Sequence, residues 1–235
     1  MAGFLTSIIV ATNIFSANAA ILFSGGTIIA WNDATNSIEV LRDHSVLVED
    51  NIIKSIFPGI SSNTTLPTDL RIINSTNDIL TPGFIDTHRH SWQTALKTLG
   101  SNATLIDYFP KFGFPGAPST TFSPEDIHIS QLAGLYEAMN AGVTTIVDSA
   151  HASWSEEHAM AALEGSFESG VRGVWAFQLG DSVSTGWKFD EQVTFFKNVS
   201  KDERWSSSAT TIGIAYDAFD GGNQTQTQIV LDLAR

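Results

Sequence analysis

The sequence contains no cysteine. Disulfides, thiolate nucleophiles and cysteine-ligated zinc are therefore excluded, which leaves histidine and the carboxylates as metal ligands. Positive charge is also scarce, because 12 Lys and Arg residues face 25 Asp and Glu residues and the formal net charge is −13. Such an acidic protein is not attracted to nucleic acids or to anionic membranes. Small neutral or cationic molecules remain as the expected ligands.

Long hydrophobic runs are absent as well. The hydrophobic content of 43% and the charged content of 16% allow a sizeable core and exclude a mainly disordered chain. The longest apolar stretch, from about Phe4 to Phe15, is interrupted by Asn13. It falls short of the roughly 20 residues that are needed to cross a bilayer. We therefore expect no membrane span.

The N-terminal apolar stretch has a different expected role. It precedes Ala17-Asn18-Ala19, an A-x-A-like cleavage site, so residues 1–19 are predicted to be a secretory signal peptide. No Lys or Arg precedes the stretch, and a cytoplasmic location is the alternative to secretion. Glycosylation sequons, which suit a secreted glycoprotein, begin at Asn63, Asn74, Asn102, Asn198 and Asn223.

Two patterns of secondary structure follow one another along the chain. Between residues 20 and 78, short β-rich runs alternate with turns rich in Gly, Asn, Asp and Ser, which predicts a small β-sandwich. From residue 79 to residue 235, strands alternate with longer amphipathic segments, which is typical of βα units around a parallel sheet. The expected sandwich strands are residues 21–23, 27–31, 45–48, 52–57 and 71–73, and the expected parallel strands are residues 84–90, 143–148, 173–177 and 211–216.

Cap signals delimit the helices between the parallel strands. The Ser-Pro-Glu-Asp sequence at residues 123–126 provides an N-cap, a proline at the first helical position and a carboxylate at the third, and Gly142 lies past the end. Further helices are expected over residues 156–168 and about 190–198. The predicted buried face of the first helix consists of Ile127, Leu132, Leu135, Tyr136 and Met139.

Residues 101–122 form the longest stretch without a regular pattern. As the loop after the first parallel strand, this stretch would lie over the edge of the sheet where barrel enzymes have their active sites. It can be a lid over a site or a hydrophobic cover whose aromatic side chains pack on the rim. The aromatic residues in it are Tyr108, Phe109, Phe112, Phe114 and Phe122.

The strongest chemical signal lies at residues 82–90, Pro-Gly-Phe-Ile-Asp-Thr-His-Arg-His. In a strand the side chains at i and i+2 point to the same face, so His88 and His90 converge and Arg89 points away. Two imidazoles on one rigid strand can bind the same divalent metal ion. Because many His-x-His sequences bind no metal, the residues around this pair decide its role.

This stretch resembles the amidohydrolase superfamily, whose first barrel strand ends in Pro-Gly-x-x-Asp-x-His-x-His, and every fixed position is present. Residues 21–29 and the Ala-Gly-Val-Thr-Thr sequence at residues 141–145 are similar to that family as well. The resemblance covers nearly all of residues 20–235 and points to the cytosine-deaminase-like and triazine-hydrolase-like branch, as in fungal amidohydrolase-related proteins. It implies an α/β fold in which a β-sandwich precedes strands one to four of a (β/α)8 TIM-like barrel.

The resemblance also implies a metal-dependent hydrolase that acts on C–N bonds other than peptide bonds. In such a deaminase or amidohydrolase, a metal-activated water attacks a heterocyclic or amide carbon. His88 and His90 would be the metal ligands in this chain. One ion, zinc or alternatively iron, is expected, because no Lys follows the fourth strand, where two-metal members carry one. The implied substrate is a small nitrogen heterocycle.

Other parts of the family's site have no counterpart in this sequence. The family's ligands after strands five, six and eight and its acid–base residues would lie beyond Arg235, so no catalytic residue is predicted within the chain. The alternative to an active enzyme is therefore a truncated, catalytically inactive fragment. Because half a barrel has unpaired edge strands, pairing of two copies in a homo-oligomer is left open.

Several further residues are weaker candidates. Asp86 shares the face of His88 and is expected either to orient an imidazole or to make a structural hydrogen bond. His151 follows the second parallel strand and can contact the substrate at the pocket mouth. Trp92 and Gln178 can line the pocket, although Trp92 can equally pack at the start of a helix. His44, His128 and His158 are expected in the sandwich and on helices, as ordinary solvent-facing or hydrogen-bonded residues.

Overall fold

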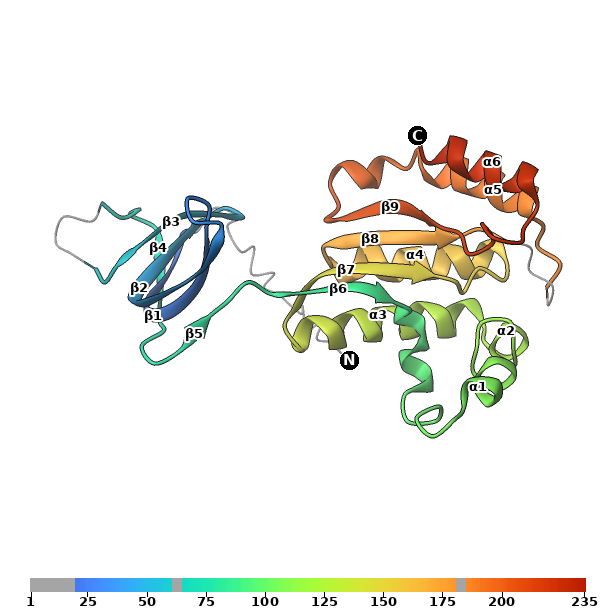
Figure 1. The fold of residues 1–235 in the computed structure, drawn as a ribbon, viewed down its shortest axis with the longest axis horizontal. Coiled ribbons are helices and arrows are strands. Elements are labelled where there is room, and N and C mark those ends of the chain that lie inside the picture. Colours follow the sequence, from blue (N-terminus) through green and yellow to red (C-terminus); the bar gives the residue numbers. More distant parts are fainter. Residues whose placement is uncertain (1–19, 61–64, 181–184) are drawn as a thin grey trace, which may run out of the picture. The chain divides into compact units, whose positions relative to one another are not determined.

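The computed structural model describes residues 20–60, 65–180 and 185–235, and the chain divides into two compact units, Met1–Pro82 and Gly83–Arg235 (Figure 1). The predicted signal peptide and the sequon at Asn63 lie outside the described residues. Within the described residues, no helix is both long and apolar enough to cross a membrane.

The first unit contains one sheet with the strand order β3-β2-β1-β4, and β5 pairs with β1. β1, β2 and β3 are antiparallel neighbours, whereas β4 and β5 run parallel to β1. The described residues of this unit form this sheet alone, so they supply one layer of the predicted sandwich. The strands are β1 (Ala20–Asn32), β2 (Ser37–Glu49), β3 (Ile52–Pro58), β4 (Leu70–Asn74) and β5 (Ile79–Leu80).

β1 replaces the two separate strands that were predicted at residues 21–23 and 27–31. The chain continues through Gly25 and Gly26, where the register between β1 and β2 shifts. Gly25 has a φ of +78°, a conformation that a residue with a Cβ rarely adopts. The two glycines therefore mark a bulge inside one strand, not a turn between two.

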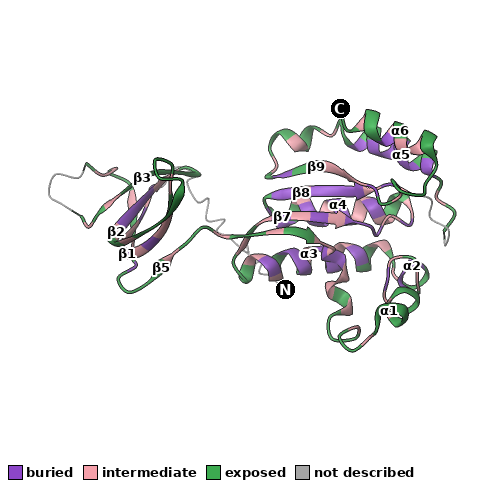
Figure 2. Ribbon diagram, in the orientation of Figure 1, coloured by how far each residue is buried: buried purple, intermediate pink, exposed green. Residues whose placement is uncertain are grey.

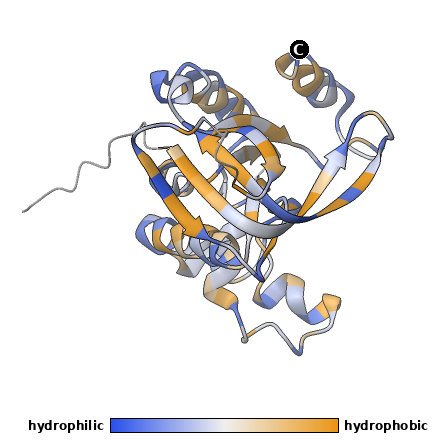
Figure 3. Ribbon diagram, turned by 90° about the vertical axis from the view of Figure 1, so that its left-hand side faces the viewer, coloured by the Kyte–Doolittle hydropathy of each residue, from blue (hydrophilic) through white to orange (hydrophobic). Residues whose placement is uncertain are grey.

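Much of the first unit's apolar surface is exposed. β2 starts well before the predicted residues 45–48, and its early residues Ile38 and Val40 are 68% and 51% exposed. Ile53 on β3 and Ile72 on β4 are exposed as well, whereas the buried core is small and centres on Leu22. The sheet ribbons accordingly carry long apolar stretches (Figure 3).

The second unit is built from the predicted βα units. Its four strands are parallel and have the order β6-β7-β8-β9, so each strand pairs with the next one along the chain. The helices flank this sheet (Figure 1). The strands are β6 (Phe84–Arg89), β7 (Val143–Ala150), β8 (Gly173–Gln178) and β9 (Thr210–Ala215), and the helices after them include α3 (Pro124–Asn140), α4 (Glu156–Ser169), α5 (Phe189–Val199) and α6 (Gln224–Leu233).

The cap signals of the sequence delimit these helices as predicted. Ser123 caps α3 in a complete capping box with Asp126. α4 begins after its N-cap Ser155 and ends at Gly170, which is left-handed with a φ of +65°. The predicted buried face of α3 is wrong at Tyr136, which is 47% exposed, because the helix turns Gln131, Gly134 and Ala138 inward instead.

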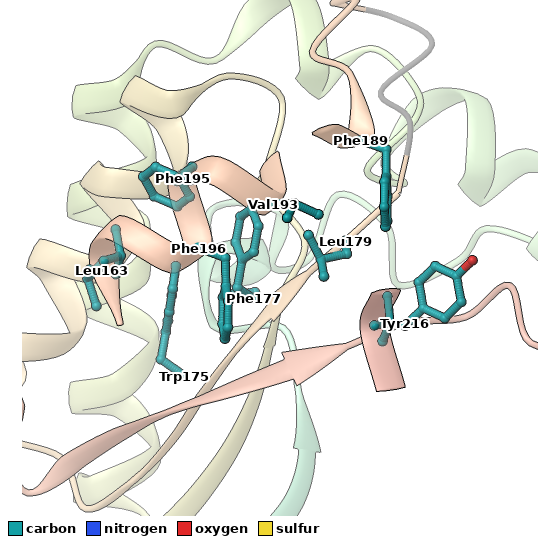
Figure 4. Close-up of a cluster of buried hydrophobic side chains, with 13 residues drawn as sticks. Leu163, Trp175, Phe177, Leu179, Phe189, Val193, Phe195, Phe196 and Tyr216 are labelled. Carbon is teal, nitrogen blue, oxygen red and sulfur yellow. The ribbon is translucent and has the colours of Figure 1, made fainter. Parts of the chain in front are cut away.

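A large aromatic cluster holds the β8 and α5 side of the second unit together (Figure 4). Phe177 is fully buried, and its ring centroid lies 5.6 Å from that of Trp175 and 5.2 Å from that of Phe195. The buried residues follow β8 and one face of α5 (Figure 2). This cluster packs β8 and the β9 end of the sheet against α5.

The stretch at residues 101–122, predicted to be irregular, contains two short helices, α1 (Leu105–Lys111) and α2 (Pro118–Thr121). Thr104 caps α1 by accepting a hydrogen bond from the backbone of Asp107, a local cap signal that the aromatic composition obscured. Before this stretch, the 3-10 helix η1 (Ser91–Leu96) begins directly after His90. A second such turn, η2 (Glu203–Ser206), precedes β9.

Candidate functional site

The two histidines of the His-x-His pair lie side by side at the carboxyl end of β6. His88 is on the strand and His90 follows its last residue, Arg89. Their ring centroids are 4.8 Å apart in an edge-to-face arrangement, as the two-residue period of a strand predicts. His88 is exposed and His90 is half-buried.

The ring of His90 is held in one orientation by β7. Its Nδ1 lies 2.8 Å from the backbone oxygen of Ser149. A carbonyl oxygen can only accept a hydrogen bond, so Nδ1 carries the proton and the Nε2 lone pair is left free. A histidine that ligates a metal ion typically donates its other ring N–H in this way.

His151 lies against His90, but it is buried and does not lie at a pocket mouth. Its side chain is 5% exposed, and its ring centroid is 3.8 Å from that of His90. The indole Nε1–H of Trp92 donates to its Nδ1 over 3.0 Å. Burial, followed by the charge of His90, lowers the pKa of His151 to about 3, so this ring is neutral at physiological pH.

Trp92 lies beneath the histidines. It is 1% exposed and packs edge to face against Phe122 and Trp154. The structure therefore gives Trp92 the packing role at the start of η1 that was the alternative to pocket lining, together with a hydrogen bond to His151. Its role as a substrate contact is not supported by this burial.

The stretch at residues 101–122 covers the side of His151. The ring of Phe114 lies 5.0 Å from that of His151, and its backbone oxygen accepts a hydrogen bond from Trp154 over 2.6 Å. Phe109 is 48% exposed and takes no part in this packing cluster. The stretch thus behaves at Phe114 and Phe122 as the predicted hydrophobic cover.

Asp86 and Arg89 bind the backbone around the pair. The carboxylate of Asp86 accepts the N–H of His88 at 3.3 Å and lies 3.6 Å from the Arg89 guanidinium. Arg89 points away from the histidine face, as predicted, and donates to the backbone oxygen of Gly134 on α3 over 3.0 Å. Of the two roles predicted for Asp86, these contacts match the structural hydrogen bond.

A buried carboxylate beneath the site, Asp148 on β7, was missed by the sequence reasoning. It is 3% exposed and accepts the backbone N–H of Ser91 at 2.9 Å and the side-chain amide of Gln131 at 2.5 Å. Burial raises the pKa of Asp148 despite these hydrogen bonds. One sequence signal could have found it. Every second residue of β7 is buried, and Asp148 is an acidic residue at such a position, between Ile146 and Ala150.

Gln178 is at the end of β8, two strands away from β6. Its side-chain amide donates to Asp217 over 2.9 Å, and its backbone oxygen accepts from Ser153. The structure therefore joins Gln178 to the end of β9 and not to the histidines. Its substrate role stays a prediction.

Only some of the pockets described in the second unit adjoin the histidines. One pocket, of about 560 Å³, lies between the start of α4 and α5 and is lined by Trp154, Glu157 and Trp187. His90 lines a different, open hollow of about 440 Å³ together with Gln93. The candidate site is centred on His90, because the geometry of the imidazole rings, and not the pocket volume, indicates metal binding.

The remaining histidines have local partners, as expected for residues outside a site. His44 lies 2.6 Å from the backbone oxygen of Arg42, His128 lies 3.0 Å from Glu168, and His158 contacts Ser155. Among the described residues, no group of three or more His, Asp or Glu side chains is arranged to hold a metal ion.

Comparisons with known proteins agree with the fold. No family model matches the chain. The 5-methylthioadenosine/S-adenosylhomocysteine deaminase of Caldicellulosiruptor saccharolyticus is 27% identical over 183 residues, which cover 78% of this chain and 40% of that protein. The 5'-deoxyadenosine deaminase of Methanosphaera stadtmanae is 27% identical over 177 residues, covering 75% and 38%.

Solved structures also match most of this chain. The zinc complex of atrazine chlorohydrolase from Arthrobacter aurescens TC1 has a TM-score of 0.69 and 18% identity, covering 91% of this chain and 50% of that one. Guanine deaminase from C. acetobutylicum has a TM-score of 0.71 and 14% identity with the same coverage. The chain thus spans about 40% of these curated relatives and half of these structures. The predicted α/β fold, with four βα units that match about half of these barrel neighbours, is confirmed, and of the β-sandwich predicted before them the described residues form one sheet.

Proposed function

We propose that this chain, which resembles the N-terminal half of amidohydrolase-superfamily enzymes, supplies two histidine ligands to the metal site of a deaminase. His88 and His90 would bind one divalent cation, zinc or alternatively iron, at the carboxyl end of β6. The whole protein would hydrolyse a C–N bond in a nitrogen heterocycle. We therefore expect activity only from a protein that also carries the remaining metal ligands.

One observation carries this proposal, the state of the His90 ring. Its Nδ1–H donates to Ser149, so its Nε2 lone pair is free, and His88 lies 4.8 Å away by ring centroids. Paired imidazoles of this kind fit zinc, which takes nitrogen ligands in a chain without cysteine. When bound, such a cation supplies Lewis acidity and lowers the pKa of a coordinated water.

The names of the relatives support the substrate class. Those relatives are deaminases of adenosine derivatives, and one structural neighbour is a guanine deaminase. We propose a small heterocycle with an exocyclic amino group, which water would replace with release of ammonia. Gln178 remains a candidate substrate contact, because its side chain is at the carboxyl edge of the sheet, whereas Trp92 and His151 are buried beneath His90.

Zinc titration of the purified chain tests the ligand assignment. We expect the wild type to bind one zinc ion and both His88→Ala and His90→Ala to weaken binding by about 100-fold or more, because each removes a ligand. His44→Ala is the matched control, since His44 is on β2 of the first unit. Unchanged zinc binding by the double variant His88→Ala/His90→Ala would exclude the site.

Ammonia release from a panel of aminopurine nucleosides tests the reaction class. A catalytic zinc typically has three protein ligands, and the proposed pair would supply two of them. We therefore expect no measurable turnover by residues 1–235 alone and turnover by a longer protein that carries the remaining ligands. Turnover by the 235-residue chain that His90→Ala abolishes would show that a further ligand is present in it.

Export and glycosylation also remain proposals. They rest on residues 1–19, outside the described part, and on sequons whose Asn74, Asn102, Asn198 and Asn223 side chains are exposed in the structure. N-terminal sequencing of the protein from its native source would test the export proposal. A mature N-terminus near Ala20 would support it, and an intact Met1 would contradict it.

A further inference from the structure

We infer that Asp148 is a positioning residue that fixes the ring of His90 through the backbone of Ser91. The inference concerns how His90 is held, and it rests on the proposed function only for its effect on metal binding. Asp148 does not touch the imidazole nitrogens in the described contacts. It acts on the chain segment that carries the ring.

The position of Asp148 in the second unit supports this role. It is 3% exposed, on β7, and its two carboxylate oxygens face different elements. One accepts the N–H of Ser91, the first residue of η1, and the other accepts the amide of Gln131 on α3. Gln131 also donates to Ser166 on α4 over 3.0 Å. One carboxylate thereby joins the end of β6 to two helices.

Two consecutive residues of β7 hold two consecutive residues after β6. The Asp148 carboxylate holds Ser91 at 2.9 Å, and the Ser149 backbone oxygen holds the Nδ1–H of His90 at 2.8 Å. The register of the strands fits this arrangement, because Arg89 pairs with Asp148. The bond from Ser91 to the Asp148 carboxylate fixes the backbone directly after His90. The bond from the His90 Nδ1–H to the Ser149 oxygen fixes the orientation of the ring. Loss of the first bond should therefore loosen the second.

The surrounding polar groups explain why a carboxylate is suitable here. Both of its partners are donors, and a carboxylate accepts without presenting a hydrogen that needs a partner of its own. Asparagine can substitute, because its oxygen can still accept from Ser91 and its amide can face Gln131. The Oε1 atom of Gln131 is buried without a partner and becomes the required acceptor if that amide rotates, at the expense of its bond to Ser166. Leucine has the same branched shape but is larger and offers no acceptor.

Long-range ¹H–¹⁵N spectra of the full chain without metal test the inference. The His90 signals are assigned by their loss in His90→Gln. We expect the wild type and Asp148→Asn to show the His90 tautomer with the proton on Nδ1. Asp148→Leu should show a mixture of the two tautomers, because Ser91 is no longer held. A wild-type tautomer in folded Asp148→Leu would overturn the inference.

Two further variants separate positioning from general stability. Ser91→Pro removes the same N–H from the other side of the bond and places a ring carbon against the Asp148 carboxylate, at the first position of η1, where proline is tolerated. It should reproduce the tautomer mixture even if Asp148→Leu fails to fold. Gln131→Met removes the other bond of the carboxylate, so it should lower the urea midpoint while it leaves the His90 tautomer unchanged. A tautomer mixture in Gln131→Met but not in Ser91→Pro would overturn the inference.

Zinc affinity gives a second readout. Loss of a group that orients a ligand typically costs roughly 10–100-fold in metal affinity, and we expect this increase in Kd for Asp148→Leu and Ser91→Pro but not for Asp148→Asn. If the wild type binds no zinc, the proposed function fails, while the tautomer measurement still decides the role of Asp148. If the variants bind zinc like the wild type, the inference fails and the proposed function stands.

Discussion

The second unit has two regions that differ in how they are packed. The β8 and α5 region buries Trp175, Phe177 and Phe195 in one aromatic cluster (Figure 4). The β6 region exposes Phe84 and Ile85 at 68% and 66% and carries the histidine pair. Stability is thus concentrated on one side of the sheet and the candidate chemistry on the other. Sites are commonly placed on a less stable segment that a rigid neighbour supports.

The largest expected effect is on the packed side. Phe177→Ala removes a fully buried ring, so we expect a loss of about 3–5 kcal/mol in the free energy of unfolding. Urea denaturation followed by tryptophan fluorescence measures it. Zinc affinity of the folded fraction should not change, because the cluster does not include the histidines. A loss of zinc binding in the folded fraction would show that the two regions are not separable.

The second prediction concerns a substitution in the histidine region. His90→Ala removes a half-buried ring at the site and should weaken zinc binding by about 100-fold, which corresponds to about 2.8 kcal/mol at 1.4 kcal/mol for each factor of ten. The unfolding free energy should change by less than in Phe177→Ala, and calorimetric zinc titration beside urea denaturation measures both. If His90→Ala destabilises the fold as strongly as Phe177→Ala, then His90 is mainly a packing residue.

A third change lies at the boundary of the two regions. Trp92→Phe keeps an aromatic ring but removes the N–H that binds His151, leaving a buried nitrogen without its donor. An unsatisfied buried acceptor costs about 1–3 kcal/mol, so a loss of that size is expected in urea denaturation. Trp154→Phe is the matched control, because its indole binds a backbone oxygen of the cover instead of His151. A change of equal size in the imidazole signals of His151 in both variants would contradict a specific link between Trp92 and His151.

Local signals allowed much of this architecture to be predicted from the sequence. The capping box at Ser123, the left-handed Gly170 and the strand period at His88 and His90 each depend on a few adjacent residues. The failures depend on distant contacts. Asp148 looks like a surface acid until Ser91 and Gln131 are brought against it, from 57 and 17 residues away. Gly25 reads as a turn until its neighbouring strand is known.

The smallest expected effect concerns α3, which begins at the exposed capping box and carries Gln131. Hydrogen bonds from the backbone and then the side chain of Ser123 lower the pKa of Asp126 below its usual 3.8. A lowered carboxyl pKa in the folded state means that this stabilisation is present above pH 3.8 and is lost as the pH falls through the lowered value. Asp126→Asn should therefore reduce the urea midpoint slightly at pH 7, and the difference from the wild type should shrink at the lowest pH at which both still fold. Because the capping box is exposed, zinc affinity and the His90 tautomer should not respond, and a change in either would mean that the start of α3 is coupled to the site through Gln131.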